Sequence, residues 1–406
     1  MRILIIGINY RPEMAGIGPY TAGLAEHLRD SGYDVSVVSG LPHYPDWRLT
    51  SSAPRQLIAT EEIAGIRVTR AAHYVPSRQT AVGRLMYEGT FLLTSLLAAT
   101  LRQPRPAVIL GIVPALTGGI VARMAATRHG VPYGILFQDL MGPAGRESGI
   151  EGGRTVARLA SAAERWAAQA ASAVGVISEA FQPYLQQLGV DPALTHVVPN
   201  WTRPMEAALA PDEVRDRFHW DDGRAVVLHG GNIGLKQGLE QVIEAAQIAS
   251  HRDLPVRFVL AGGGNQEATL RSLAEGLANV DFVGVQPDGV YASLLRAADI
   301  LLLSERPTQL NMSLPSKLTS YLSAGRPIVA AVPADGPTAV AVRASGAGIV
   351  VPAGAAAQIL AAIEQLSGDP ALAAQLAAAG QRYARERLGH EPSLERARAF
   401  VNAIST

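Results

Sequence analysis

Residues 225–240, AVVLHGGNIGLKQGLE, decide how the rest of the chain is interpreted. The apolar run 225–228 predicts a buried strand, a glycine-rich turn follows it, and helical periodicity begins at Gly238. Glycines let a backbone approach a ligand closely, and the free N–H groups of a helix start attract negative charge, which Lys236 would reinforce. The stretch therefore suits a phosphate or diphosphate, although similar βα turns also occur without a ligand.

Composition excludes several classes of protein. The 406 residues are 48% hydrophobic, which is enough for two medium-sized α/β domains. Lys plus Arg and Asp plus Glu each number 35, so no net charge favours a nucleic-acid partner. There is no cysteine, which excludes disulfides and thiolate sites and suits a reducing cytoplasm. The apolar runs 2–6, 91–101 and 108–121 are too short for a signal-peptide core or a membrane span.

The first half of the chain starts as a βαβ unit. Tyr20, Leu24 and Leu28 mark one face of the first helix. The glycines before it do not have the G-x-G-x-x-G spacing of dinucleotide-binding proteins, which argues against a nicotinamide or flavin cofactor. Strands are predicted at 2–6, 35–38, 108–112, 133–137 and 173–177, with a helix at about 115–128.

The second half repeats this rhythm. The alternation of short apolar runs with helical patterns predicts a parallel sheet covered on both faces. The segment 199–204, with two prolines, is typical of an interdomain hinge. Strands are predicted at 226–228, 257–260, 280–283, 300–303 and 328–331.

Two further segments carry residues that suit catalysis or anion binding. Asp139 follows a strand's carboxyl end, where it could orient an acceptor hydroxyl or take its proton; the alternative is a turn or helix-cap aspartate. Pro315, Ser316 and Lys317 offer free N–H donors, a hydroxyl and a cation to an anion; the alternative is a solvated lysine on an ordinary helix.

Two segments have both a functional and a structural interpretation. The loop 42–48, with His43, Tyr44 and Trp47, could stack on a sugar or pack against the core. Residues 76–102 carry Arg78, Arg84 and Arg102 among leucines, so this helix could lie on a membrane surface or be part of the core.

The run 231–240 resembles the donor-loop motif of bacterial retaining glycosyltransferases with the two-domain GT-B fold, a family 4-like group. Within it, the chain most resembles the colanic acid biosynthesis fucosyltransferases, which also share Pro42-His43-Tyr44 and the run 315–318 before Ala324-Gly325. The resemblance implies two Rossmann-like doubly wound domains facing across a cleft. Residues 1–200 would bind the acceptor, 201–390 the nucleotide sugar, and 391–406 would return as a helix to the first domain.

The resemblance also implies the site residues. Many members of the wider superfamily carry two glutamates around this helix, one of which holds the donor ribose, but Met312 and Ser320 stand at those positions here. Ribose recognition is therefore unassigned, and Glu305 is a weak substitute. Catalytic roles fall to Lys236, Lys317 and Asp139, and acceptor binding to Glu13, His43, Tyr44 and Trp47. Donor binding falls to Gly16, Gly18, Gly231, Asn232, Gly234, Gly262, Gly263, Gly264, Val285, Gln286, Leu314, Pro315 and Ser316.

The reaction implied is retaining transfer of a sugar from a GDP- or UDP-sugar, with GDP-fucose as the first candidate. The acceptor would be lipid-linked or an oligosaccharide, in exopolysaccharide or cell-surface polysaccharide biosynthesis at the inner face of the cell membrane. Two lysines would neutralise the leaving diphosphate, so neither a metal ion nor another cofactor is expected. A nucleotide-sugar 2-epimerase and a non-catalytic sugar-nucleotide-binding subunit are the alternatives.

Overall fold

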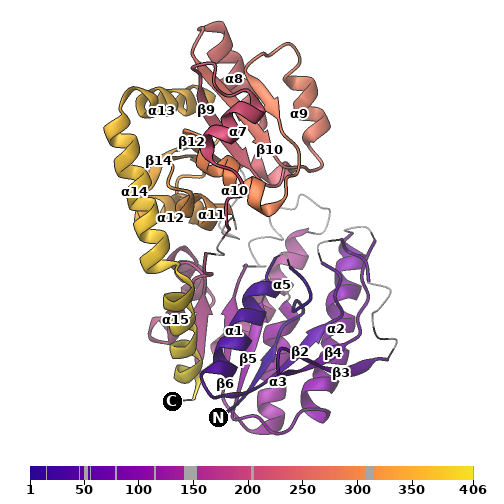
Figure 1. Ribbon diagram of the computed structural model, residues 1–406. Coiled ribbons are helices and arrows are strands. Elements are labelled where there is room, and N and C mark those ends of the chain that lie inside the picture. The colour runs from indigo at the N-terminus through magenta and orange to yellow at the C-terminus, as the bar shows by residue number, and fades with distance from the viewer. Residues whose placement is uncertain are drawn as a thin grey trace. The chain divides into compact units, whose positions relative to one another are not determined.

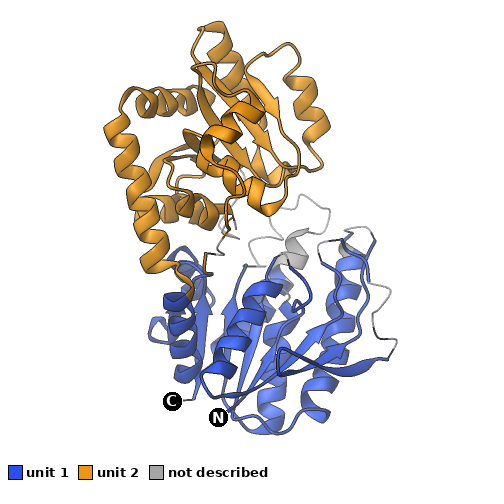
Figure 2. Ribbon diagram, in the orientation of Figure 1, with its two compact units in different colours: residues 1–200, 391–406 blue, residues 201–390 orange. Residues whose placement is uncertain are grey.

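The computed structural model describes residues 1–14, 16–44, 46–49, 54, 56–77, 80–113, 116–140, 153–202, 205–307, 315 and 317–405, with the backbone alone at 81, 153–157 and 159. The chain forms two compact units, residues 1–200 with 391–406 and residues 201–390 (Figure 2). Each unit has its own sheet and core.

The first unit is built on an eight-stranded sheet of β1 (Arg2–Ile6), β2 (Asp34–Gly40), β3 (Ile58–Ile63), β4 (Ile66–Ala71), β5 (Val108–Val113), β6 (Tyr133–Phe137), β7 (Ala173–Val176) and β8 (Thr195–Val197). The strand order is β3-β4-β2-β1-β5-β6-β7-β8, and all neighbours are parallel except β3 and β4. The inner strands are almost entirely buried, because helices cover both faces of the sheet (Figure 1).

The β3–β4 hairpin is absent from the sequence prediction. Ile63 pairs with Ile66, so the loop is only Ala64 and Gly65, whose φ angles are 50° and 69°. Two positive φ angles are typical of the tight hairpin turns that Asn-Gly favours, and alanine is an unusual choice there. The hairpin was missed because its turn residues and the polar, exposed β3 give a weak strand signal.

The helices of the first unit include one from the end of the chain. Helix α15 (His390–Ile404) buries Phe400 and Ile404 in the core that also holds Ile3. A Cβ on Gly134 would lie 2.5 Å from Ile404 Cδ1, so a bare backbone in β6 makes room for this helix. The others are α1 (Gly18–Asp30), α2 (Ala81–Leu101), α3 (Leu116–His129), α5 (Gly153–Gln169), α6 (Gln182–Gln187) and the 3-10 turns η1 (Glu179–Phe181) and η2 (Pro192–Leu194).

The second unit is built on a six-stranded parallel sheet of β9 (Ala225–Gly230), β10 (Val256–Ala261), β11 (Val280–Phe282), β12 (Ile300–Ser304), β13 (Ile328–Val332) and β14 (Gly348–Pro352). The order β11-β10-β9-β12-β13-β14 contains all five predicted strands and adds β14 at the edge.

Alternating side chains of these strands feed two cores, one on each face. Val227 and Leu302 lie in one core, and Val226 and Leu301 lie in the other. The covering helices and turn are α7 (Pro211–Phe218), η3 (Leu235–Gln237), α8 (Glu240–His251), α9 (Glu267–Leu273), α10 (Asp288–Ala297), α11 (Lys317–Ala324), α12 (Pro337–Ser345), α13 (Ala356–Gly368) and α14 (Pro370–Arg387). The predicted α/β class with two Rossmann-like doubly wound units is confirmed. Among the described helices, none combines the length and hydrophobicity that a membrane span needs.

Candidate functional site

The carboxyl ends of three neighbouring strands in the second unit bring the predicted donor loops together. Strands β10, β9 and β12 are adjacent, and the loops 262–266, 231–239 and 305–307 follow them directly. Parallel sheets bind ligands outside the carboxyl ends of their strands. We call this the candidate donor edge.

Glycines let two of these loops touch backbone to backbone. The Ile233 N–H donates to the Gly263 carbonyl at 2.9 Å. A Cβ on Gly262 would lie 1.8 Å from the Gly231 carbonyl oxygen, and one on Gly264 would lie 2.3 Å from that of Ile233. The sequence predicts that these glycines approach a ligand. The structure adds that Gly262 and Gly264 must lack a Cβ, because any side chain there would clash with the backbone of the loop after β9.

Lys317 is the first residue of α11 and lies against the glycine loop. Its Nζ is 3.0 Å from His229 Nε2, and a Cβ on Gly231 would lie 3.3 Å from its Cε. Burial lowers the pKa of the Lys317 ammonium to about 7, partly opposed by the Glu305 carboxylate. Within the described part of the chain no carboxylate forms an ion pair with it. Among the described residues, Lys317 is therefore a half-buried amine that feels the Glu305 charge but has no carboxylate hydrogen-bonded to it.

His229 is a member of this site that the sequence prediction missed. It is the fifth residue of β9, its side chain is fully buried, and its ring joins Lys317 to the middle of β12 through the Leu302 carbonyl. Burial and the Lys317 charge lower the pKa of the imidazole well below its usual value. The available signal was a histidine at the end of an apolar strand, directly before two glycines.

Lys236 lies toward the end of the glycine loop, in the turn η3. The helix after this loop begins at Glu240 and not at Gly238, whose φ of +53° ends the turn. The Arg306 N–H donates to the Lys236 carbonyl at 3.1 Å, which joins the turn to the segment after β12. The Lys236 side chain is exposed and, among the described residues, has no hydrogen bond or ion pair. Both predicted lysines thus lie at the same sheet edge.

These two residues are the only lysines in the sequence, whereas arginines number 33. Arginine presents a planar fork, and lysine presents a compact point charge whose pKa shifts readily on burial. The chain therefore uses arginine for its other 33 basic positions and lysine only beside the glycine loop.

The remaining predicted donor residues differ in exposure. Val285 is 78% exposed, and a Cβ on Gly263 would lie 3.2 Å from its Cγ2. Gln286 donates from Nε2 to the Val283 carbonyl at 2.9 Å. Asn232 is exposed, Gly234 is buried beside it, and Pro315 is half-buried before α11, whereas Met312, Leu314 and Ser316 lie outside the described residues.

Glu305 follows β12 and is half-buried. Its Oε1 accepts a hydrogen bond from the Thr338 hydroxyl at 2.5 Å. Burial raises the pKa of the Glu305 carboxyl, and the Thr338 hydrogen bond and the Lys317 charge lower it. This carboxylate already has a partner, and its role toward a ribose stays a prediction.

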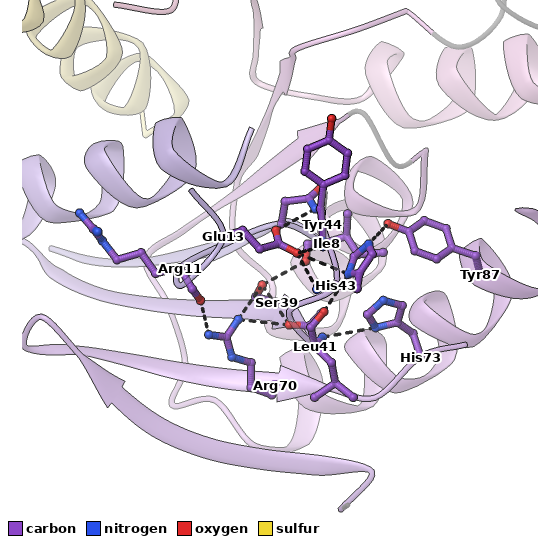
Figure 3. Close-up of polar contacts among 12 residues, drawn as sticks. Ile8, Arg11, Glu13, Ser39, Leu41, His43, Tyr44, Arg70, His73 and Tyr87 are labelled. Atoms are coloured by element: carbon purple, nitrogen blue, oxygen red, sulfur yellow. Dashed lines mark hydrogen bonds and ion pairs between the residues drawn. The ribbon is translucent and has the colours of Figure 1, made fainter. Parts of the chain in front are cut away.

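In the first unit, Glu13 joins the loop after β1 to the loop after β2 (Figure 3). Its Oε1 accepts from the backbone N–H groups of His43 (2.9 Å) and Tyr44 (3.0 Å), and its Oε2 accepts from Asn9 Nδ2 (2.9 Å). Glu13 is only 4% exposed. The carboxylate therefore acts as a clamp between the two loops.

His43 is buried in a cluster of rings (Figure 3). Its Nδ1 donates to the Leu41 carbonyl at 2.8 Å, so in the neutral ring Nε2 accepts from the Tyr87 hydroxyl at 3.0 Å. The ring of His73 lies 5.0 Å away, and burial followed by the effect of His43 lowers the pKa of His73 to about 4. His43 and Glu13 are thus predicted acceptor residues whose side chains face the interior.

Tyr44 and Trp47 are the accessible members of the predicted acceptor set. Tyr44 is 37% exposed, and Trp47 is half-buried with its ring 5.6 Å from that of His43. Gly16 lies under the Tyr44 ring, and Gly18 begins α1 with its backbone against Glu13. The structure therefore brings these six predicted residues together at one end of the sheet, where Tyr44 is the most exposed of the rings.

Asp139 lies two residues beyond β6, where it is half-buried. The preceding Gln138 anchors the segment, because its N–H donates to the Val113 carbonyl (2.7 Å) and its Oε1 accepts from Asn200 Nδ2 (2.7 Å). The predicted aspartate thus sits at the carboxyl edge of the sheet that also carries Glu13 and Tyr44.

Helix α2 has a buried face and an exposed apolar face. Tyr87 and Phe91 are buried, so the core interpretation holds for one side of the helix. Arg84 pairs with Glu88, Arg102 is exposed, and Arg78 lies outside the described residues. The exposed apolar side chains are Val82 (68%), Leu85 (73%), Met86 (48%), Leu93 (69%), Leu97 (50%) and Leu101 (65%).

Two family models match the chain: the glycosyl transferase 4-like domain at residues 15–201 and the glycosyl transferases group 1 at residues 211–383. The chain is 34% identical over 335 residues to the putative colanic acid biosynthesis glycosyl transferase WcaI of Escherichia coli, covering 80% of this chain and 82% of that one.

Solved structures share the fold across nearly the whole chain. Sucrose-phosphate synthase from Thermosynechococcus elongatus matches with a TM-score of 0.74 and 18% identity, covering 97% of this chain and 96% of the other. Anabaena Alr3699/HepE in complex with UDP matches with a TM-score of 0.70 and 17% identity, covering 99% and 100%. At these identities the likeness concerns the fold alone.

Proposed function

Because the chain belongs to the glycosyltransferases with a 4-like and a group 1 domain in the GT-B fold, we propose that it transfers a sugar, with retention of configuration, from a nucleoside diphosphate sugar to an acceptor hydroxyl. The observation that carries the proposal is Lys317, a half-buried lysine that lies against the bare backbone of Gly231 and has no described carboxylate hydrogen-bonded to it. A diphosphate is the anion that a glycine loop, a helix start and a lysine would bind together.

The leaving diphosphate gains negative charge as the sugar bond breaks. Lys317 and Lys236, with the N–H groups at the start of α8 and α11, would stabilise that charge in place. Helix α8 has no side-chain cap, but the N–H groups of residues 241–243 already donate to the carbonyls of Gly238 and Leu239, so its first turn contributes mainly through the helix dipole. In this scheme the two ammonium groups take the charge-neutralising role, so we propose a reaction that is independent of metal ions.

The donor is proposed to be GDP-fucose. This choice rests on the resemblance to the fucosyltransferase group and on the similarity to a relative named for colanic acid biosynthesis. The exposed Val285 beside Gly263 offers an apolar surface for a base. A UDP-sugar is the competing candidate, since the Anabaena protein of the same fold was solved with UDP.

We assign the acceptor to the first unit, residues 1–200, and the donor to residues 201–390. The exposed side of Tyr44 would contact a sugar ring, with Asp139 orienting the reacting hydroxyl. A lipid-linked acceptor accounts for the exposed leucines of α2, which would rest on the inner face of the cell membrane. The product would enter an exopolysaccharide or cell-surface polysaccharide.

Ligand-induced stabilisation tests the donor class. A ligand at a hundred times its Kd raises the free energy of unfolding by about 2.7 kcal/mol, so GDP or UDP should raise Tm clearly. Stabilisation by UDP and not by GDP would reject GDP-fucose, and stabilisation by neither would reject the proposed function. Incubation with the labelled donor then separates the activities, because hydrolysis or transfer excludes a non-catalytic subunit and interconversion of sugar epimers would indicate a 2-epimerase.

A further inference from the structure

His229 is a fully buried ring in a strand whose other side chains are apolar, and the proposed donor chemistry does not use it. A buried polar group is costly unless it is hydrogen-bonded. Its contacts therefore indicate what the ring does.

Both ring nitrogens face a partner. The Leu302 carbonyl oxygen lies 3.2 Å from Nδ1, and a carbonyl only accepts, so Nδ1 carries the hydrogen. Nε2 also lies 3.5 Å from the Asn232 carbonyl oxygen, but its shorter contact, at 3.0 Å, is with the Lys317 ammonium, so Nε2 is the acceptor and Lys317 its donor. The opposite tautomer would set the bare Nδ1 against an oxygen lone pair and an N–H against an ammonium.

The surroundings keep this ring neutral. Burial and the charge of Lys317 lower the pKa of His229 well below its usual value. Among the described residues, the other titratable groups here are Glu305, which acts on Lys317, Tyr321, whose hydroxyl accepts from the Gly230 N–H at 2.7 Å, and Tyr291, whose ring lies against Gly230. A neutral imidazole can accept from the ammonium without adding a second charge.

We propose that His229 is a positioning residue, which holds the Lys317 ammonium beside the bare backbone of Gly231 and directs its remaining N–H groups toward a bound diphosphate. A lysine side chain is flexible, and a hydrogen bond to a fixed ring restricts the ammonium to few orientations before the ligand binds. The inference rests on the proposed function, because the diphosphate is that of the donor.

The two lysines make a direct test available without any ligand. Lysine labelled at its side chain gives one signal from Lys317 and one from Lys236, so both titrations can be followed by NMR. His229→Phe keeps the bulk of the ring and removes the acceptor, which should lower the pKa of Lys317 by about 1–2 units. His229→Gln can place an oxygen near the position of Nε2 and should retain most of the wild-type value.

Further variants guard against failure to fold. His229→Asn can still bond Leu302 but is too short to reach Lys317, so it should behave as His229→Phe does. The Lys236 signal is the internal reference and should not move in any variant. An unchanged Lys317 titration in folded His229→Phe or His229→Asn would overturn the proposal.

A second measurement connects the pair to the donor. In calorimetry, His229→Phe should weaken GDP or UDP binding about tenfold or more, and adding it to Lys317→Met should cause no further loss. Leu228→Ala, a change in the same strand, should lower Tm without changing affinity. If His229→Phe lowered nucleotide affinity equally in the wild type and in Lys317→Met, the positioning role would be overturned. If the wild type binds no nucleoside diphosphate, the proposed function fails, while the lysine titration still decides whether His229 holds Lys317.

Discussion

The ring of Tyr44 lies so close over Gly16 that a Cβ on Gly16 would come within 2.8 Å of Tyr44 Cε1. Gly16 also has a φ of +65°, which L side chains rarely adopt. Gly16→Ala should therefore cost about 1–2 kcal/mol in backbone strain and also displace the ring. If Tyr44 stacks on the acceptor, the KM for acceptor should rise about tenfold, the effect of losing one aromatic contact.

Gly32→Ala is the matched control for this change. Gly32 has a φ of +87°, and a Cβ there would have no neighbour within 4 Å, so the backbone strain is similar but no ring moves. Steady-state kinetics with varied acceptor should separate the two variants. Equal acceptor KM values for them would remove Tyr44 from the acceptor site.

The Glu13 clamp gives a prediction about stability. Glu13→Gln preserves the shape of the side chain, but only the amide oxygen can accept; the amide NH2 would face either Asn9 Nδ2 or the backbone N–H groups of His43 and Tyr44, donor against donor. Leaving a buried donor unsatisfied costs about 1–3 kcal/mol, so urea unfolding should show a loss of about 2 kcal/mol. Glu62→Gln, at an exposed position of β3, should be neutral. A Glu13→Gln protein as stable as the wild type would show that the clamp contributes little.

The sequence predicts the central elements well because burial determines their patterns. An apolar run as short as that of β9, followed directly by glycines, favours a buried strand over a helix, and the motif around Lys236 marks the loop after it. Burial of individual polar residues depends on tertiary contacts that no local pattern records. His43 therefore looks like a surface residue of an aromatic loop, although it is buried among rings, and His229 looks like part of a strand although it contacts Lys317.

Lys317 gives a prediction about pH. The pKa of Lys317 is about 7 in the folded chain and 10.5 in its ordinary state. Below pH 7 the folded chain bears the full free-energy cost of burying the charged ammonium. This cost falls as the pH rises from 7 to 10.5, because the folded state then holds the lysine neutral. The stability of the wild type relative to Lys317→Met should therefore increase with pH across this window. Urea titrations of both proteins at matched pH test it, and a constant difference would contradict the lowered pKa.

Binding of a nucleoside diphosphate should be coupled to the same titration. The anion favours the ammonium form of Lys317, so binding should take up protons near pH 8, where much of this lysine is neutral. Calorimetry in buffers of different ionisation enthalpy measures this uptake. Lys317→Met should abolish it, and equal uptake by the two proteins would place the titrating group elsewhere.

The exposed face of α2 gives a prediction about membranes. Leu85 and Leu93 are 73% and 69% exposed, so replacing both with serine should lower binding to anionic vesicles while leaving Tm within the range of ordinary surface changes. Vesicle flotation measures the binding. Leu273→Ser, which alters a leucine that is 44% exposed on α9, is the control. Unaltered flotation of the double variant, or no flotation of the wild type, would leave this face without a membrane role.

The last prediction concerns Lys236, whose ammonium is exposed beside the glycine loop and has no partner among the described residues. Its attraction to the diphosphate should be strongest when the sugar has left and the full charge has developed, so its loss should impair the transition state more than donor binding. Lys236→Ala should reduce turnover on the order of a hundredfold, comparable to losing an oxyanion donor, with donor KM changed much less. Lys236→Arg should restore only part of the rate, because its charge is spread over a larger planar group. The Tm should stay near that of the wild type, since an exposed loop side chain contributes little to stability. If a folded Lys236→Ala enzyme turned over at nearly the wild-type rate, Lys236 would have no role in stabilising the leaving diphosphate, and that role would fall to Lys317 alone.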